Sequence, residues 1–281
     1  MLEKMKIKIK YVSDFIQWNI NPYKKYDGTA FFKIKEAINS LKNKSFYKYQ
    51  GFLNSDEVEN LKKKIFLNIN EAQTKIRKEH LFRQRSVFPG ENPIFQDLIN
   101  NNFITSVAKG FYNAKHVHFM KITYELKKGI GKFNLNKMKD DIVNQEYHYH
   151  ADRHFGQLKF CLLLNDIGKN NGPLSVIPGS QKWPRSFVDF KHRIKTFYGN
   201  GHAAPMPTFD REKIEKFFNE GNQVKATGKK GDLIVLNTCA YHKGDNLKEN
   251  FKREVLWFYT KFPSSFESFT GKIKNSIIKK N

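Results

Sequence analysis

Two histidines and one aspartate have the residue types and spacing of a metal site. His150 and Asp152 lie two residues apart in the segment Tyr147–Asp152 (Tyr-His-Tyr-His-Ala-Asp). Side chains at positions i and i+2 of a β-strand point to the same side, so both could reach one point. A mixture of imidazole nitrogen and carboxylate oxygen suits a redox-active divalent metal such as Fe(II). His242, which follows a short apolar segment, is the candidate for the third ligand.

Such a set of ligands on Fe(II) leaves open positions for a bidentate co-substrate and O2. Arg253 lies eleven residues beyond His242, at the start of the next strand-like segment. A guanidinium there could clamp a carboxylate with two hydrogen bonds, and an arginine inside a barrel would need such a partner to offset its desolvation. The alternatives are a histidine–aspartate pair without a metal and an ordinary surface arginine. His148 creates a competing His-x-His pattern, but only His150 has an aspartate two residues later.

These residues lie among predicted β-strands. Runs of apolar and β-branched residues, separated by irregular loops, continue from residue 116 to residue 262 with few helices between them. This order argues against a parallel, doubly wound sheet and favours an antiparallel barrel or jelly roll. The predicted strands cover residues 116–126, 157–165, 174–177, 232–237 and 253–262.

The first 110 residues are predicted to be mostly helical. Helices are expected over Lys33–Leu41, from Ser55, which can cap the helix, and over Pro93–Ala108, with a short strand that begins at Phe46 and ends at Gly51. We expect a single domain over residues 1–281. It would have helices packed outside the barrel (1–110), a jelly-roll core (111–262) with a lid or insert at 181–222, and a basic tail (263–281).

The composition is that of a globular protein with a strong excess of positive charge. The chain has 281 residues, 39% of them hydrophobic, and 50 Lys and Arg against 27 Asp and Glu give a net charge of +23. This excess allows three interpretations: nucleic-acid binding, a pocket that steers an anionic substrate, or a composition bias spread over the surface. No nucleic-acid-binding motif is visible, so no specific nucleic acid is expected.

The two cysteines, Cys161 and Cys239, form neither a disulfide framework nor a metal-site pattern, which indicates a reducing compartment. No window reaches the roughly 20 apolar residues that a membrane span needs, and no signal peptide is visible. We therefore expect a cytoplasmic protein without a membrane span. The sequence does not predict its oligomeric state.

Several motifs follow one another in the order of a known family, and their order and spacing are more specific than any one of them. The chain resembles the phytanoyl-CoA dioxygenase-like (PhyH) family of Fe(II)/2-oxoglutarate-dependent oxygenases over about residues 45 to 262. Gln181 departs from the pattern, because a histidine usually follows Pro-Gly-Ser there. The motifs are Gly51–Val58, His150–Asp152, Asn165–Leu174, Val176–Lys182, Gly231–Asp232, and His242 with Asn246 and Arg253.

The resemblance implies a double-stranded β-helix (jelly roll, cupin-like) with N-terminal helices packed outside. It implies that the triad binds Fe(II), that Arg253 binds the distal carboxylate of 2-oxoglutarate, and that Lys159 and Tyr147 are weaker candidates for co-substrate contacts. Related halogenases replace the metal-binding carboxylate with a small residue, so Asp152 favours a hydroxylase. The implied triad is His150, Asp152 and His242.

The implied reaction hydroxylates a small molecule with O2 and releases succinate and CO2. The alternative is a catalytically inactive jelly-roll protein that binds a small ligand. The substrate is expected to contact the segments 127–144 and 181–222, and an anionic substrate is one hypothesis. Candidate contacts to such a substrate are Arg153, His154, His192, Arg193 and His202.

Overall fold

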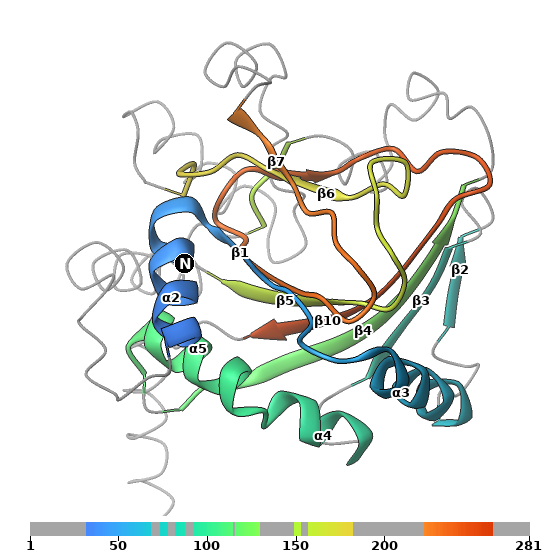
Figure 1. Ribbon diagram of the computed structural model, residues 1–281, viewed down its shortest axis with the longest axis horizontal. Helices are drawn as coiled ribbons and strands as arrows, with labels where there is room; N and C mark the ends of the chain where they lie inside the picture. The colour runs from blue at the N-terminus through green and yellow to red at the C-terminus, as the bar shows by residue number, and fades with distance from the viewer. Residues whose placement is uncertain are drawn as a thin grey trace, which may run out of the picture.

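Two antiparallel sheets face each other and enclose the interior of the protein (Figure 1). The computed structural model describes residues 32–68, 74–77, 82–87, 93–114, 116–129, 149–152, 157–181 and 222–260. The larger sheet has the strand order β1-β8-β5-β10-β4-β3-β2, and the smaller has the order β7-β6-β9. This arrangement confirms the predicted jelly roll. The strands of the larger sheet are β1 (Phe46–Tyr49), β8 (Leu233–Asn237), β5 (Leu158–Leu163), β10 (Lys252–Thr260), β4 (Phe119–Lys128), β3 (Phe82–Val87) and β2 (Thr74–Arg77), and those of the smaller are β7 (Val224–Lys225), β6 (Leu174–Val176) and β9 (His242–Gly244).

The outer face of the larger sheet carries the main hydrophobic core. Alternate residues of its central strands pack against the helices α2 (Phe32–Lys44), α3 (Ser55–Asn68), α4 (Pro93–Ile99) and α5 (Asn102–Tyr112), which lie along this face in Figure 1. The alternation follows from the pleat, because successive side chains of a strand point to opposite faces. The sheet residues of this core are Tyr47, Ile122, Tyr124, Leu158, Phe160, Leu162, Leu233, Val235, Leu256 and Phe258.

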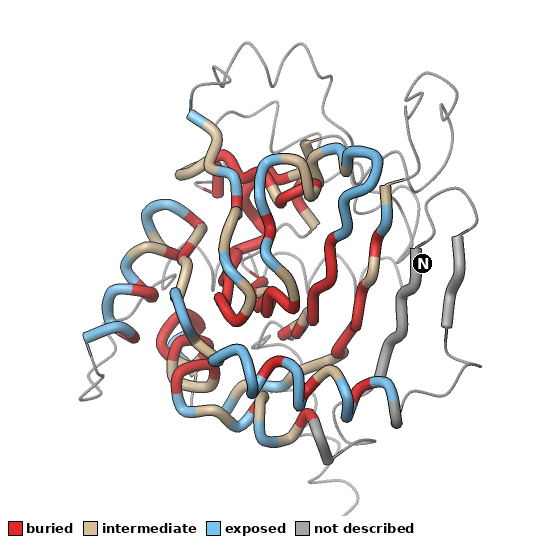
Figure 2. Tube along the Cα trace, turned by 45° about the vertical axis from the view of Figure 1, so that its right-hand side comes forward, coloured by how far each residue is buried: buried red, intermediate tan, exposed pale blue. Residues whose placement is uncertain are grey.

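The other set of alternate residues points into the space between the two sheets. Deep in this interior a second, smaller apolar cluster includes Cys161, Leu163, Ile234 and Val255. Cys161 is therefore a core residue, and burial raises the pKa of its thiol. Figure 2 shows the same pattern, with buried stretches concentrated in the central strands and exposed residues on the turns and helix surfaces.

The N-terminal helices agree with the sequence in position but differ in how they begin and end. The cap of α3 is Asn54 and not Ser55, because Asn54 Oδ1 accepts a hydrogen bond from Glu57 N (3.0 Å) while Glu57 Oε2 accepts one from Asn54 N (2.7 Å). This reciprocal pair is a capping box. The helix predicted over Pro93–Ala108 is two helices, since Asn101 caps α5 by accepting from Phe103 N (2.9 Å).

The motifs at Gly51 and at Gly231–Asp232 are partners in space. The Asp232 carboxylate accepts hydrogen bonds from Gly51 N (2.8 Å) and Lys229 N (3.0 Å), and Gly231 O accepts one from Leu53 N (3.0 Å). Gly231 has a φ of +90°, and a Cβ there would lie 2.0 Å from Leu53 O. A glycine is required because the two turns approach so closely. These contacts attach the loop after β1 to the turn that begins β8.

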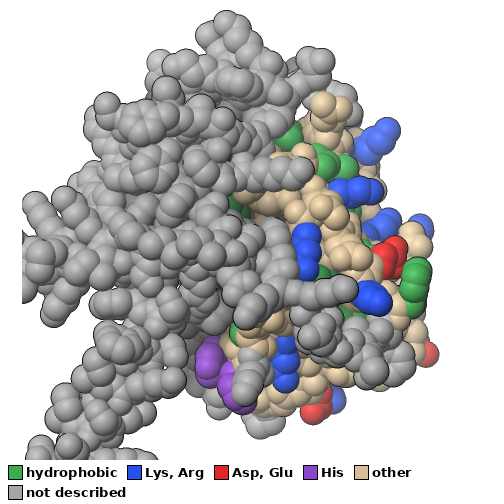
Figure 3. Space-filling model, turned by 90° about the vertical axis from the view of Figure 1, so that its left-hand side faces the viewer, with side chains coloured by type: hydrophobic (Ala, Val, Ile, Leu, Met, Phe, Trp, Pro, Cys, Tyr) green, Lys and Arg blue, Asp and Glu red, His purple; other side chains and the backbone are tan. Residues whose placement is uncertain are grey.

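Among the described residues, no helix is both long enough and apolar enough to cross a bilayer. On the face drawn in Figure 3, described lysine and arginine side chains lie at several places along one side, with a few acidic side chains among them.

Replacing Asp232 by alanine should destabilise the fold. The side chain is buried (4% exposed), and its loss would leave two backbone N–H groups without their acceptor. We expect a loss of about 2–3 kcal/mol in the free energy of unfolding, measured by urea denaturation. Asp166→Ala is the matched control, because Asp166 also accepts a backbone hydrogen bond but is exposed. A loss for Asp232→Ala no larger than that of the control would contradict this assignment.

Candidate metal centre

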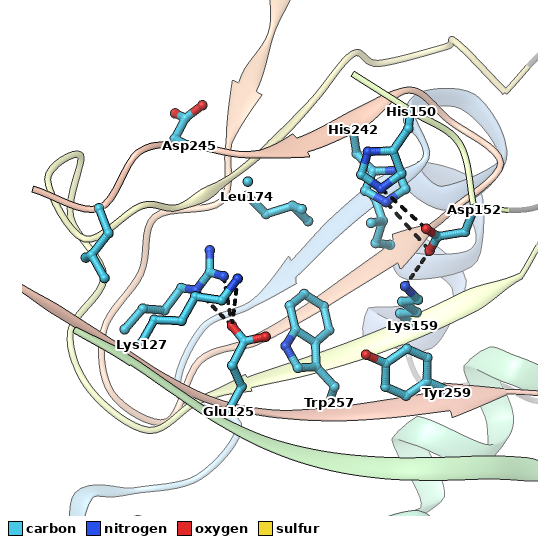
Figure 4. Close-up of a pocket in the computed structure, with 14 residues that line it drawn as sticks. Glu125, Lys127, His150, Asp152, Lys159, Leu174, His242, Asp245, Trp257 and Tyr259 are labelled. Atoms are coloured by element: carbon cyan, nitrogen blue, oxygen red, sulfur yellow. Dashed lines mark hydrogen bonds and ion pairs between the residues drawn. The ribbon is translucent and has the colours of Figure 1, made fainter. Parts of the chain in front are cut away.

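His150, Asp152 and His242 come together at one point in the interior. One ligand atom from each of them lies within 4.8 Å of the other two, and this is the arrangement of three groups that could hold a metal ion. His150 Nε2 is 3.4 Å from Asp152 Oδ1, and His242 Nε2 is 3.7 Å from Asp152 Oδ2. Figure 4 shows both imidazoles and the carboxylate directed toward each other at one end of a pocket. Two nitrogens and one oxygen on one side of a metal form the facial triad of non-haem Fe(II) sites.

The backbone places the two histidines next to each other although they are far apart in the sequence. His150 and His242 form an isolated antiparallel bridge, in which each N–H donates to the carbonyl oxygen of the other at 2.9 Å. Asp152 N donates to Thr238 O (3.0 Å), which continues the pairing toward the end of β8. The spacing of the metal ligands is therefore set mainly by main-chain hydrogen bonds.

The Pro-Gly-Ser motif holds the backbone next to His242 in position. Ser180 is fully buried, and its Oγ accepts a hydrogen bond from Tyr241 N (2.7 Å), the residue before the ligand. Gln181, which stands where the family pattern has a histidine, donates from Nε2 to Lys42 O (2.6 Å) near the end of α2. The departure at Gln181 thus serves packing between a loop and a helix.

The protonation states of the triad suit metal binding. Burial lowers the pKa of His242 and Asp152 opposes this only in part, so the imidazole is neutral at pH 7. His242 Nδ1 lies 2.9 Å from Ala240 O, and a proton on Nδ1 leaves Nε2 with its lone pair toward the centre. Burial alone would raise the pKa of Asp152, but Lys159, followed by His242 and His150, outweighs it and holds this pKa well below its usual value.

Lys159 lies beside the triad. Its ammonium forms an ion pair with Asp152 Oδ2 and stands 4.7 Å from the ring centroid of Tyr259. Lys159 is on β5 and Tyr259 is opposite it on β10, so the strand register brings the two together. Lys159 therefore faces the pocket, and its role toward the co-substrate stays a prediction.

Arg253 lies at the other end of the same pocket and is buried (8% exposed). Glu125 Oε1 accepts from its Nη2 at 2.8 Å and from its Nε at 3.2 Å, and Gly172 O accepts from its Nη1. Gly172 has a φ of +62°, and a Cβ there would lie 2.7 Å from Asp245 O. The guanidinium is thus held by a carboxylate on β4 and by a tight turn before β6.

Sequence reasoning did not single out several of the described residues that line the pocket, among them Glu125, Lys127, Trp257 and Tyr259. Figure 4 shows Trp257 and Tyr259 along one side of the pocket and Glu125 with Lys127 near the end that is away from the histidines. The sequence did hold a signal for Glu125 and Lys127, because charged side chains at alternate positions of one strand point to the same side. Tyr147, His148, Arg153, His154, His192, Arg193 and His202 lie outside the described residues.

The comparisons with known proteins agree with this geometry. The family model described as phytanoyl-CoA dioxygenase (PhyH) matches residues 46–254, which is most of the chain. No curated protein matches the sequence. The match includes every residue of the triad and Arg253.

Solved structures with the same fold share little sequence with the chain. EctD from S. alaskensis, with 2-oxoglutarate and 5-hydroxyectoine, has 14% identity and a TM-score of 0.60, covering 85% of this chain and 79% of its own. The epimerase SnoN, with Fe3+, alpha ketoglutarate and nogalamycin RO, has 12% identity and a TM-score of 0.57, covering 81% and 82%. The carbocyclase SnoK from nogalamycin biosynthesis has 13% identity and a TM-score of 0.57, covering 85% and 90%. At these identities the likeness establishes the fold.

Removing the carboxylate of the triad should remove metal binding. We expect Asp152→Ala to bind Mn(II), a redox-inert probe for Fe(II), at least about 100-fold more weakly, measured by calorimetry on metal-free protein. Circular dichroism should show an unchanged fold, since Asp152 is held in place by its backbone N–H. His148→Ala and the exposed His116→Ala are the controls and should bind Mn(II) normally. Loss of binding in His148→Ala would instead favour the His-x-His pattern.

Proposed function

The chain belongs to the phytanoyl-CoA dioxygenase family and is a non-haem Fe(II)/2-oxoglutarate-dependent oxygenase; from this premise we propose that it hydroxylates a small-molecule substrate. The overall reaction converts R–H, O2 and 2-oxoglutarate into R–OH, succinate and CO2. The observation that carries the proposal is a single pocket with His150, Asp152 and His242 at one end and Arg253 at the other. A short dicarboxylate that chelates a metal with one end needs a metal site at one end of the pocket and a cation for its second carboxylate at the other.

The residues of the pocket have separate tasks in this proposal. The triad holds Fe(II), which supplies the O2 chemistry when bound. Arg253 binds the distal carboxylate of 2-oxoglutarate, in an orientation fixed by Glu125. Lys159 binds a carboxylate oxygen close to the metal, since its ammonium already contacts Asp152. Tyr147 remains a candidate for lining the same pocket.

Hydroxylation is the outcome that the triad favours. A halogenase of this kind needs a metal position vacated by a protein carboxylate, and here Asp152 is present with a pKa well below its usual value. Its ionised carboxylate is therefore available as a ligand at neutral pH.

We propose that the substrate is anionic and is phosphorylated, sulfated, carboxylated or linked to CoA. The net charge of +23 supports an electrostatic attraction of anions. The proposed substrate contacts lie in residues 127–144 and 181–222. We further propose a cytoplasmic location and one domain over residues 1–281, with the divisions given above.

The function predicts substrate-dependent formation of succinate. Protein loaded with Fe(II) should convert 2-oxoglutarate to succinate with uptake of O2, and an accepted substrate should increase this rate and gain one oxygen atom by mass spectrometry. The screen pairs each anionic metabolite with its neutral counterpart, which tests the proposed substrate class separately.

Asp152→Ala is the control for adventitious iron and should form no succinate above background. The oxygenase assignment would be wrong if the wild-type protein formed none with any substrate and if neither Fe(II) nor 2-oxoglutarate changed its melting temperature. A small ligand from the screen that raised the melting temperature under those conditions would favour a catalytically inactive binding protein.

A further inference from the structure

Two cations lie directly opposite each other at the end of the pocket that is away from the metal centre. In the antiparallel pairing of β10 with β4, Arg253 is the register partner of Lys127. Side chains that are directly opposite in such a pair have Cβ atoms about 4.5–5.5 Å apart, and like charges at these positions destabilise a sheet. Both residues line the pocket and both are buried, with 8% and 7% of their surface exposed. A buried pair of like charges requires anions close by.

One of these anions is part of the protein. Glu125 lies two residues before Lys127 on β4, so its side chain points to the same face. Its Oε1 is 2.8 Å from Arg253 Nη2 and 3.9 Å from Lys127 Nζ. A single carboxylate oxygen is therefore shared by both cations. Among the described residues, Asp245 also lines the pocket, and its carboxylate forms an ion pair with Lys225 at 2.8 Å.

The formal charges of the three residues add to one positive charge. Arg253 and Lys127 contribute two, and Glu125 offsets one of them. The distal carboxylate of 2-oxoglutarate carries one negative charge, which a group of two cations and one carboxylate can bind. Because both cations converge on one oxygen of Glu125, a carboxylate that binds Arg253 is also within reach of Lys127.

We propose that Lys127 is a second binding residue for the distal carboxylate of 2-oxoglutarate and that it makes the pocket selective for dicarboxylate 2-oxo acids. This inference rests on the proposed role of 2-oxoglutarate as co-substrate. Glu125 holds Arg253 and Lys127 beside each other and prevents the site from carrying two unbalanced charges when it is empty. Lys127 adds a charge-assisted hydrogen bond that a 2-oxo acid without a distal carboxylate does not form.

The test compares two 2-oxo acids of equal chain length. 2-Oxoglutarate has the distal carboxylate, and 2-oxovalerate has a methyl group in its place. Their dissociation constants are measured by calorimetry on Mn(II)-loaded protein without O2, so that no turnover occurs. In Lys127→Met, the affinity for 2-oxoglutarate should fall by about 10- to 100-fold, the range of a hydrogen bond to a charged group. The affinity for 2-oxovalerate should stay within about twofold, which also shows that the variant is folded.

Lys128→Met is the matched control, because Lys128 is the next residue of β4 and its side chain is exposed. It should bind both 2-oxo acids as the wild-type protein does. Lys127→Arg should keep most of the preference for 2-oxoglutarate, since it retains the charge. A Lys127→Met variant with an unchanged ratio of the two affinities, or one with equal losses for both acids, would overturn the role of Lys127. Failure of the wild-type protein to bind 2-oxoglutarate would instead overturn the proposed co-substrate.

Discussion

The structure depends on placing charged side chains inside a β-sheet sandwich, where each charge must have a partner. One face of the larger sheet is apolar and packs on the helices, and the other face carries Glu125, Lys127, Lys159 and Arg253 into the interior. A buried ion without a partner costs several kcal/mol. Among the described residues, the interior contains an ion-paired group around Asp152 and another around Glu125. The apolar face supplies the stability that a charged interior would not.

Main-chain hydrogen bonds fix the positions of the residues that form the metal site. The two histidines of the triad are joined by reciprocal backbone hydrogen bonds, and Ser180 fixes the residue before one of them. At the opposite end, Gly172 lets its carbonyl oxygen reach Arg253 in a turn that a Cβ would obstruct. Groups held by a sheet vary little in position, which is what preorganisation of a reactive centre requires. The Pro-Gly-Ser and Gly-Asp motifs thus act through Ser180 and Asp232, whose side chains accept backbone hydrogen bonds, and supply none of the triad residues.

The sequence predicted the jelly roll, most of its central strands and the three residues that converge, because each left a local pattern. The resemblance to the family suggested Lys159 as a weaker candidate, and the order of the motifs led to His242 and Arg253. The sequence did not predict Glu125 as the partner of Arg253. Alternation shows which side of the sheet a residue faces, but it does not give the register between two strands. The strands β2, β3, β7 and β9 were missed, since β2, β7 and β9 have only four, two and three residues and β3 (Phe-Arg-Gln-Arg-Ser-Val) is mostly polar. The break at Asn101 was missed because an asparagine that caps a helix resembles a polar residue within one.

The charges of the described pocket residues bear on the class of substrate. With Fe(II) bound, Lys127, Lys159 and Arg253 bring the positive charges to five, and Asp152, Glu125 and the two carboxylates of 2-oxoglutarate bring the negative charges to four. The two histidines are ligands in their neutral form, and Asp245 is balanced by Lys225. The charges of these described groups therefore sum to one positive charge in a region of low dielectric, where its field is weakly screened. An anion next to the metal would offset this charge, whereas a cation would add to it, which supports the anionic substrate proposed above.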